Sequence, residues 1–188
     1  MVDGLGFKWS NVDQAVFYQR EHGLLIIMLL VHMDNCTIVA NKLLVIQRFK
    51  INIAKHLEIT DLDELHWILG IEVHCICESC LLLLSQCLYI DLILQCYGFK
   101  DTKPVSLPID PSTRLSSAQS PSTMEEFTCM RNVPYLEAVG SLMYASLGTW
   151  SDITYAVQAV SRFSTKLDVA HWEAVKRVFH YLKGTRDL

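Results

Sequence analysis

The chain has 188 residues, of which 51% are hydrophobic, so its length and composition allow a packed core and exclude a disordered tail. Its formal net charge of −4 excludes a basic surface over the whole chain, so any contact with phosphates would have to come from local clusters of Lys and Arg. No basic segment with a cleavage site opens the sequence, and the apolar run from Leu24 has about half the length needed to cross a bilayer. The cysteines are odd in number, seven, which without a secretory signal indicates reduced thiols. We therefore expect an intracellular protein.

The N-terminal part of the chain has the pattern of paired strands. Residues 24–31 are an unbroken apolar run, which is typical of a strand buried on both faces. Alternation over residues 16–18 predicts a preceding strand that pairs with this run. A second apolar run, residues 36–40, follows the polar segment 32–35, whose Asp and Asn are favoured in turns. The sequence thus predicts a hairpin with a single carboxylate, that of Asp34, at its tip.

This carboxylate has two interpretations. A strand pair needs no charge for its stability, and charge is unfavourable in a desolvated position. Asp34 is therefore either a solvated turn residue or a ligand for a divalent cation, which prefers oxygen donors. The hairpin pattern alone favours the turn residue, because Asp and Asn are common in turns for backbone reasons.

Further along the chain, helical patterns alternate with a second hairpin. Asn41 is predicted to cap a helix that buries one stripe of its side chains. Residues 67–76 and 81–84 predict the second hairpin, and residues 86–97 predict a helix that ends at Gly98. These elements are predicted to form a mixed sheet with helices packed on it.

The composition changes between residues 103 and 133, where Pro, Ser and Thr replace large apolar residues. This segment is predicted to be a linker or an extended surface strap, with a domain boundary inside it. Three helical patterns follow, over residues 135–147, from 151 or 152 to 163, and over 168–183, with Gly148 and Gly184 expected to end the first and the third.

Two further groups of residues invite a functional interpretation. Thiols and an imidazole near the second hairpin suggest zinc: His74, Cys75, Cys77, Cys80 and Cys87. Their spacing favours small apolar packing instead, because no second Cys-X-X-Cys pair completes four converging ligands. His171 lies at the start of the last helix, and three roles are open to it: capping the helix, stacking on a base, or a place at the surface or in the core. A place at the surface or in the core is favoured, because a single histidine carries no mechanism.

A series of motifs resembles the Pol polyprotein of copia-type LTR retrotransposons. Residues 32–35 resemble the Tyr-X-Asp-Asp hairpin of reverse transcriptases, with His32 in the Tyr position and Asn35 in place of the second Asp. The downstream motifs are Leu69-Gly70-Ile71-Glu72-Val73, Leu84-Ser85-Gln86, Tyr89-Ile90, Lys103-Pro104-Val105-Ser106 and Pro108-Ile109-Asp110-Pro111. In the C-terminal third they are Pro134-Tyr135, residues 138–144, Asp152-Ile153, Tyr155-Ala156-Val157, residues 171–177 and residues 181–185. The resemblance covers essentially the whole chain.

The resemblance implies an α+β fold: a partial polymerase palm and thumb with buried β-hairpins and packed helices, followed by a helical segment. Residues 1–102 would be the C-terminal part of the palm and thumb, residues 103–133 a linker, and residues 134–188 a helical connection that precedes a ribonuclease H domain absent from this chain. The implied function is that of a reverse transcriptase fragment, from an RNA-directed DNA polymerase that transfers nucleotides with two metal ions. The alternative is a non-catalytic retrotransposon remnant with at most weak nucleic-acid or partner binding.

The resemblance also assigns roles to individual residues. Asp34 would be a catalytic metal ligand and Asn35 a degraded catalytic position, while His32 and Met33 would shape the nucleotide pocket. The motif Leu69, Gly70, Ile71 would be the primer grip, where the glycine lets the backbone approach the primer. Without the resemblance, Gly70 would be assigned to a bulge. The helix over residues 86–97 would be the first thumb helix, with core packing as the alternative.

The parent family implies Mg²⁺ or Mn²⁺ as the cofactor, held by three aspartates. The resemblance carries over to Asp34 alone, because the amide of Asn35 brings no charge and the remaining Asp of the family lies upstream of this sequence. The isolated chain is therefore expected to bind no metal ion stably and to be catalytically silent. The implied partners are an RNA or DNA template–primer and the remainder of the Pol polyprotein, without a membrane, in the cytoplasm or a virus-like particle.

Nucleic-acid binding is assigned to the last helix. Its basic residues are Lys176, Arg177, Lys183 and Arg186. Cations near a helix C-terminus also complement the helix dipole, which is the alternative role for these four residues. The apolar stripe of the helix leaves much of the basic set free to face phosphates, so weak binding without sequence preference is expected.

Overall fold

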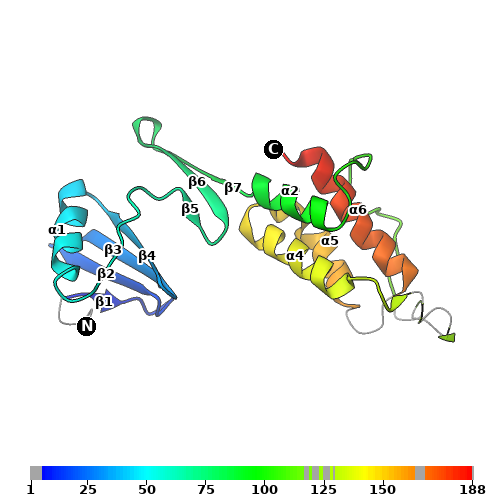
Figure 1. Cartoon of the computed structure of the whole chain (residues 1–188), viewed down its shortest axis with the longest axis horizontal. Helices are drawn as coiled ribbons and strands as arrows, with labels where there is room; N and C mark the ends of the chain where they lie inside the picture. The colour runs from blue at the N-terminus through cyan, green and yellow to red at the C-terminus, as the bar shows by residue number, and fades with distance from the viewer. Residues whose placement is uncertain are drawn as a thin grey trace. The chain divides into compact units, whose positions relative to one another are not determined.

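The structure is a computed structural model that describes residues 6–116, 119, 123, 124, 128, 130–163 and 168–187. Its helices and antiparallel sheets occur in separate stretches of the chain, which confirms the predicted α+β class. The described strands form two antiparallel sheets, so the prediction of a mixed sheet was wrong. The chain divides into two compact units, Met1–Leu65 and His66–Leu188 (Figure 1). This division lies before the predicted linker 103–133. The assignment of palm, thumb and connection to particular residues stays a prediction.

The first unit is a four-stranded antiparallel sheet with one helix. Its strands follow chain order: β1 (Lys8–Trp9), β2 (Val16–Glu21), β3 (Leu24–His32) and β4 (Asn35–Ala40). Two-residue turns join the longer strands, since Glu21 pairs with Leu24 and His32 pairs with Asn35. Helix α1 (Leu43–Ile53) lies against this sheet (Figure 1).

Strand β3 is buried on one face rather than on both. Ile27 and Leu29 are 1% and 2% exposed and pack with Phe7 and with Phe49 of α1. The alternate residues Met28 and Leu30 stay half-buried on the opposite face. A continuous apolar run does not reveal how many faces of a strand are covered, so the prediction of a strand buried on both faces was wrong.

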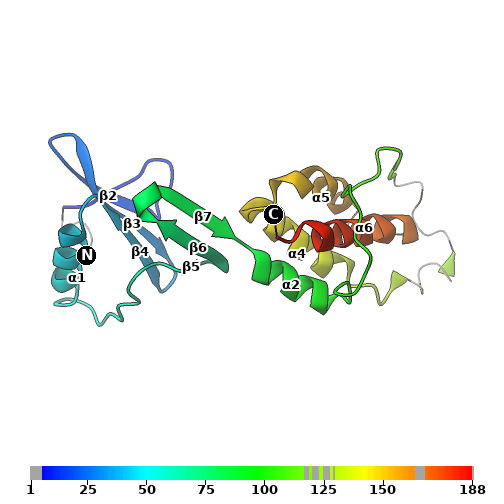
Figure 2. The same ribbon diagram turned by 90° about the horizontal axis from the view of Figure 1, so that it is seen from above.

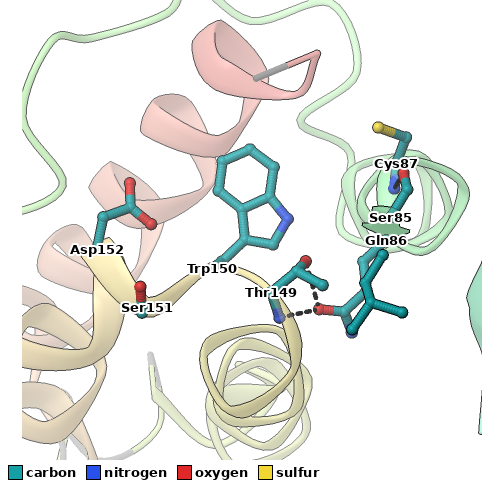
Figure 3. Close-up of a pocket in the computed structure, with 8 residues that line it drawn as sticks. Ser85, Gln86, Cys87, Thr149, Trp150, Ser151 and Asp152 are labelled. Atoms are coloured by element: carbon teal, nitrogen blue, oxygen red, sulfur yellow. Dashed lines mark hydrogen bonds between the residues drawn. The ribbon is translucent and has the colours of Figure 1, made fainter. Parts of the chain in front are cut away.

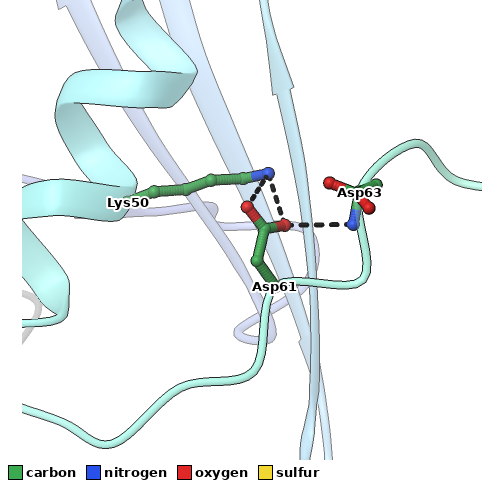
Figure 4. Close-up of polar contacts among 3 residues, drawn as sticks. All are labelled: Lys50, Asp61 and Asp63. Carbon is green, nitrogen blue, oxygen red and sulfur yellow. Dashed lines mark hydrogen bonds and ion pairs between the residues drawn. The ribbon is translucent and has the colours of Figure 1, made fainter.

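Helix α1 is fixed by contacts at its C-terminal half rather than by a cap. The residue before the helix is Lys42, whose side chain makes no capping hydrogen bond, so the predicted cap at Asn41 is wrong. Lys50 Nζ lies 2.5 and 2.7 Å from the two carboxylate oxygens of Asp61, and the backbone N–H of Asp63 donates to the same carboxylate (Figure 4). The hydrogen bond from Lys50 is the main cause that lowers the pKa of Asp61. These contacts hold the acidic connection after α1 against the helix.

The second unit begins with a three-stranded antiparallel sheet: β5 (Trp67–Ile68), β6 (Ile71–Ile76) and β7 (Leu81–Ser85), with the short 3-10 helix η2 (Cys77–Ser79) between the last two strands. Val73 is buried in this sheet. The consecutive residues Leu81, Leu82, Leu83 and Leu84 are 45%, 59%, 46% and 49% exposed. The expectation of buried hairpins was therefore wrong for this sheet.

Beyond this sheet, the described helices of the second unit pack side by side (Figure 2). They are α2 (Cys87–Cys96), α4 (Tyr135–Gly148), η4 (Ser151–Ile153), α5 (Thr154–Ser161) and α6 (Val169–Thr185). The side chains of Leu142, Ile153, Val175 and Phe179 have no exposed surface and lie in one core cluster that all these helices share. Helix α2 therefore packs in the core, as the alternative to a groove-lining thumb helix predicted.

The first part of the predicted linker lies along α6. The carbonyl of Lys103 is 2.8 Å from His180 Nδ1, Val105 N–H donates to the His180 carbonyl at 3.3 Å, and Arg177 Nε donates to the Leu107 carbonyl at 3.2 Å. This stretch is thus a surface strap, one of the two forms expected for it.

Two glycines of the helices stand at close contacts between segments. Gly184 lies inside α6 and does not end it, and a Cβ at this position would lie 2.7 Å from Pro104 Cβ of the strap. Gly148 is the last residue of α4, and a Cβ there would overlap the side-chain amide of Gln86. By contrast Gly98 follows α2 with φ +78°, as expected for a glycine that ends a helix. Among the described residues, no helix is long and apolar enough to cross a membrane.

Candidate functional site

The turn between β3 and β4 presents Asp34 to solvent. Met33 and Asp34 are the two turn residues, and both side chains are exposed, Met33 to 86%. Met33 has φ +51°, a conformation that is unfavourable by about 1–2 kcal/mol for a residue with a Cβ. His32 and Asn35 form the strand pair directly below the turn and are also exposed. The four residues 32–35 thus lie together at one hairpin tip, as the sequence predicted.

These residues do not fit a metal ion by themselves. A hard divalent cation takes six or more oxygen ligands and depends on charged carboxylates. Asp34 supplies one carboxylate and Asn35 a neutral amide at the turn. Within the part of the chain that the structure describes, no group of three or more His, Cys, Asp or Glu side chains could hold a metal ion.

A second strained turn joins β5 and β6. Leu69 and Gly70 are its two residues, between the paired residues Ile68 and Ile71, and they have φ +50° and +79°. Gly70 therefore lies in a tight turn with positive φ, and its assignment to a bulge was wrong. The hydroxyl of Tyr144 in α4 donates a hydrogen bond to the Leu69 carbonyl.

The basic residues of α6 do not form one open face. Lys176 pairs with Glu173 one turn before it, and Arg177 is bound to the Leu107 carbonyl of the strap. Arg186 Nε lies 3.1 Å from an Asp91 carboxylate oxygen of α2 and 3.4 Å from one of Asp187. At 100° per residue, Lys176 and Lys183 share a side of the helix while Arg177 and Arg186 project away from it on opposite sides. The role of this set in nucleic-acid binding stays a prediction.

A cavity of about 350 Å³ lies where the β7–α2 junction faces the α4–η4 junction (Figure 3). Gln86 is 2% exposed, and its Oε1 accepts hydrogen bonds from Thr149 N–H and Thr149 Oγ1, each at 2.9 Å. Asp152 also lines the cavity, and its carboxylate accepts a hydrogen bond from the Tyr181 hydroxyl at 2.5 Å. The sequence places Gln86 in a motif but gives no sign of its partner, because Thr149 is 63 residues away.

His171 is a buried polar residue that sequence reasoning assigned only in general terms. It has no exposed surface, its ring centroid lies 4.2 Å from that of Phe163, and its Nδ1 accepts a hydrogen bond from the Asp168 N–H at 3.0 Å. Burial lowers the pKa of this imidazole, so the neutral form is favoured. His171 thus both packs and caps α6.

Comparison with known proteins supplies the family. The profile of the family "Reverse transcriptase (RNA-dependent DNA polymerase)" matches residues 1–111. This chain belongs to the reverse transcriptase family. It is 39% identical over 173 residues to the "Retrovirus-related Pol polyprotein from transposon TNT 1-94" of Nicotiana tabacum, an alignment that covers 92% of this chain and 13% of that protein. It is 33% and 31% identical to the Pol polyproteins from transposons RE1 and RE2 of Arabidopsis thaliana, over 96% and 97% of this chain and 12% of each relative.

The resemblance to copia-type Pol polyproteins is therefore confirmed, and this reverse transcriptase chain spans about an eighth of the length of these relatives. The family match includes the Met33-Asp34 turn, the Leu69-Gly70 turn and α2, while α4, α5 and α6 lie beyond it. No solved structure matches the chain.

Proposed function

We propose that this chain is the C-terminal part of a reverse transcriptase palm and thumb, residues 1–102, followed by a linker and a helical connection, residues 134–188. Within a longer Pol polyprotein it contributes to nucleotidyl transfer along a primed template. Asp34 is its catalytic carboxylate, and His32 and Met33 border the incoming nucleotide. Its primer grip is the segment Leu69-Gly70-Ile71, which is the turn between β5 and β6 and the first residue of β6.

The observation that supports this proposal most is the strained Met33-Asp34 turn. Strained residues with positive φ cluster at functional sites, but His22, Asp63 and Cys80 also have positive φ here, so the strain supports the proposal only together with the family match at this turn. Here it holds one carboxylate at the exposed tip of a hairpin, within the part of the chain that matches the family. An ordinary solvated turn would be satisfied by Gly or Asn at the position of Met33.

The family uses divalent metal ions, Mg²⁺ or Mn²⁺, and this chain offers them one carboxylate at the turn. We therefore propose that residues 1–188 alone neither bind the ions stably nor join nucleotides. The partners in this proposal are an RNA or DNA template–primer and the other parts of the Pol polyprotein, in the cytoplasm or in a virus-like particle.

A primer-extension assay tests the catalytic half of the proposal. The purified chain is incubated with a primed RNA template, nucleotides and Mg²⁺ or Mn²⁺, and no extension is expected. Template-dependent extension that Asp34→Ala abolishes would show a complete site in these residues and contradict the proposal.

A non-catalytic remnant is the second candidate function. Two observations favour it: Asn35 lacks the charge of the second carboxylate, and Lys176, Arg177 and Arg186 already have partners within the chain instead of facing phosphates. The genomic sequence around the coding region separates the two candidates. An open frame that encodes a further Asp-bearing strand upstream supports the enzyme fragment, and stop codons there support the remnant.

A further inference from the structure

The turn of Leu69 and Gly70 has a backbone that its own sequence does not favour. Both residues have positive φ, which in a two-residue hairpin turn is typical of Asn-Gly or Gly-Gly rather than of a large apolar residue. Leu69 is 55% exposed, so packing of its side chain does not explain the conformation. The same backbone occurs at His22-Gly23, so the turn can form by itself, but a contact from another segment would stabilise it.

Tyr144 of α4 supplies that contact. Its hydroxyl donates a hydrogen bond to the Leu69 carbonyl, and a Cβ on Gly70 would lie 3.0 Å from the same oxygen. Gly70 thus serves two needs at once: positive φ and the close approach of the Tyr144 hydroxyl. Tyr144 lies 75 residues further along the chain than Leu69.

Tyr144 is itself held in place by neighbouring aromatic side chains. The Tyr89 ring of α2 packs edge-on against the Tyr144 ring, with centroids 4.7 Å apart. The Tyr89 hydroxyl donates to the Ser141 carbonyl of α4 at 3.1 Å, and the Tyr97 hydroxyl lies 3.2 Å from Ser141 Oγ. This tyrosine cluster (Tyr89, Tyr97 and Tyr144) joins α2 to α4. The Tyr144 hydroxyl that binds the Leu69-Gly70 turn is therefore held by two packed helices.

The rest of this sheet buries few side chains. Leu81–Leu84 of β7 are all exposed, and in β6 only Val73 is buried. A hairpin with so few packed side chains opens locally at a low cost in free energy, unless another contact holds its turn in place. The hydrogen bond from Tyr144 attaches the end of the hairpin that the proposed function uses.

We propose that Tyr144 is a positioning residue that fixes the Leu69-Gly70 turn against the helices and so sets where the primer grip stands. The helical segment after residue 134 is then part of the primer-binding apparatus and not only a spacer. This inference rests on the proposed function for its link to the primer, whereas the anchoring of the turn is independent of it.

Hydrogen exchange of the full chain tests the anchoring. Tyr144→Phe removes the hydroxyl and keeps the ring, and Tyr155→Phe, at a tyrosine that is 72% exposed on α5, is the matched control. We expect amide exchange over residues 67–72 to become roughly three- to tenfold faster in Tyr144→Phe, the effect of losing one hydrogen bond on a local opening equilibrium. Exchange in α4 and α6 should stay unchanged, as should all exchange in Tyr155→Phe. Unchanged exchange over residues 67–72 in Tyr144→Phe would overturn the inference.

A double-mutant cycle sharpens this test. Gly70→Ala brings a Cβ against the Tyr144 hydroxyl and also strains the backbone, but only the first effect disappears when Tyr144 is replaced by Phe. We therefore expect Gly70→Ala to speed exchange of the turn more in the native background than in the Tyr144→Phe background. Equal effects in both backgrounds would mean that Gly70 and Tyr144 are not coupled, which contradicts the proposal.

Nucleic-acid binding tests the link to the primer. The probes are a labelled RNA template with an annealed DNA primer and the same template without the primer, at one salt concentration. We expect Tyr144→Phe to weaken binding of the primed template about threefold or more and to leave binding of the unprimed template unchanged, a split that a general loss of stability does not produce. Equal weakening of both would overturn the positioning role. If the native chain does not distinguish the two templates, the proposed function fails, and the exchange and coupling results still decide the anchoring.

Discussion

The helices of the second unit and the two sheets differ in how much apolar surface they bury. Among the residues that the structure describes, nineteen buried side chains form one cluster in the helical part, whereas four, Phe7, Ile27, Leu29 and Phe49, form the core of the first sheet. Because stability follows buried apolar area, the helices are expected to be the rigid part of the chain and the sheets the deformable part. The two turns with proposed roles lie on the sheets. Rigid support for one of them comes from a helix that lies beyond the family match.

The largest expected effect is in the helical core. Phe179 has no exposed surface and stacks on Phe99 with ring centroids 4.9 Å apart. Phe179→Ala should lower the free energy of unfolding of the helical part by about 3–5 kcal/mol, and Phe179→Leu, which keeps most of the volume, by about 1–2 kcal/mol. Leu82→Ala in β7 should change it by less than about 0.5 kcal/mol. Urea unfolding followed by circular dichroism measures these changes, and similar losses at residues 179 and 82 would contradict the comparison.

The next effect separates two glycines of α4. Gly148→Ala should push aside the Gln86 amide, break its two hydrogen bonds to Thr149 and cost about 1–3 kcal/mol. A Cβ added at Gly140 would meet no neighbouring segment within 4 Å among the described residues. Gly140→Ala is therefore the matched control and should stabilise the helix by roughly 0.5–1 kcal/mol. Thermal unfolding of both variants measures these changes. If both variants are stabilised, Gln86 does not pack closely against residue 148 and the account of this contact is contradicted.

A smaller effect depends on pH through His171. Burial lowers the pKa of this imidazole in the folded chain, although Asp168 nearby acts in the opposite direction. As the pH falls below the ordinary value of 6.5, the unfolded chain takes up a proton that the folded chain still excludes. Stability is therefore complete above that pH and declines as the pH falls toward the lowered pKa. His171→Gln should flatten this decline, while His56→Gln, at an exposed position, should leave it unchanged. A native chain whose stability does not vary over this range would contradict the assignment.

The smallest expected effects are at the basic residues of α6. The exposed pair of Lys176 and Glu173 should contribute less than about 0.5 kcal/mol, so Lys176→Gln should leave stability nearly unchanged. If α6 binds phosphates, Lys183→Gln should reduce the salt dependence of binding by about one counterion and Lys176→Gln by less, because Glu173 already pairs with Lys176. Titrations of a labelled hybrid at several salt concentrations measure this, and a larger effect from Lys176→Gln would reverse the assignment.

Local features of the fold were predictable from the sequence. Polar turn residues between apolar runs mark the hairpin of β3 and β4, and Gly98 marks the end of α2. Features that depend on distant partners were not. The burial of β3 on one face depends on α1, the need for glycine at residue 184 depends on Pro104, and the turn at Gly70 depends on Tyr144. The grouping of residues 32–35 was predictable because they are adjacent, whereas the partners of the basic residues in α6 were not.

Binding of Mn²⁺ at the Met33-Asp34 turn tests the central claim that this reverse transcriptase chain carries one part of a metal site. Broadening of nuclear magnetic resonance signals locates the paramagnetic ion. For the native chain we expect weak binding at the turn, with affinity roughly in the millimolar range, that Asp34→Ala removes. Asn35→Asp should strengthen binding roughly tenfold, because a second carboxylate about 6 Å from a divalent ion contributes roughly 1.4 kcal/mol in water. Micromolar binding at Asp34 in the native chain, or no gain from Asn35→Asp, would contradict the account.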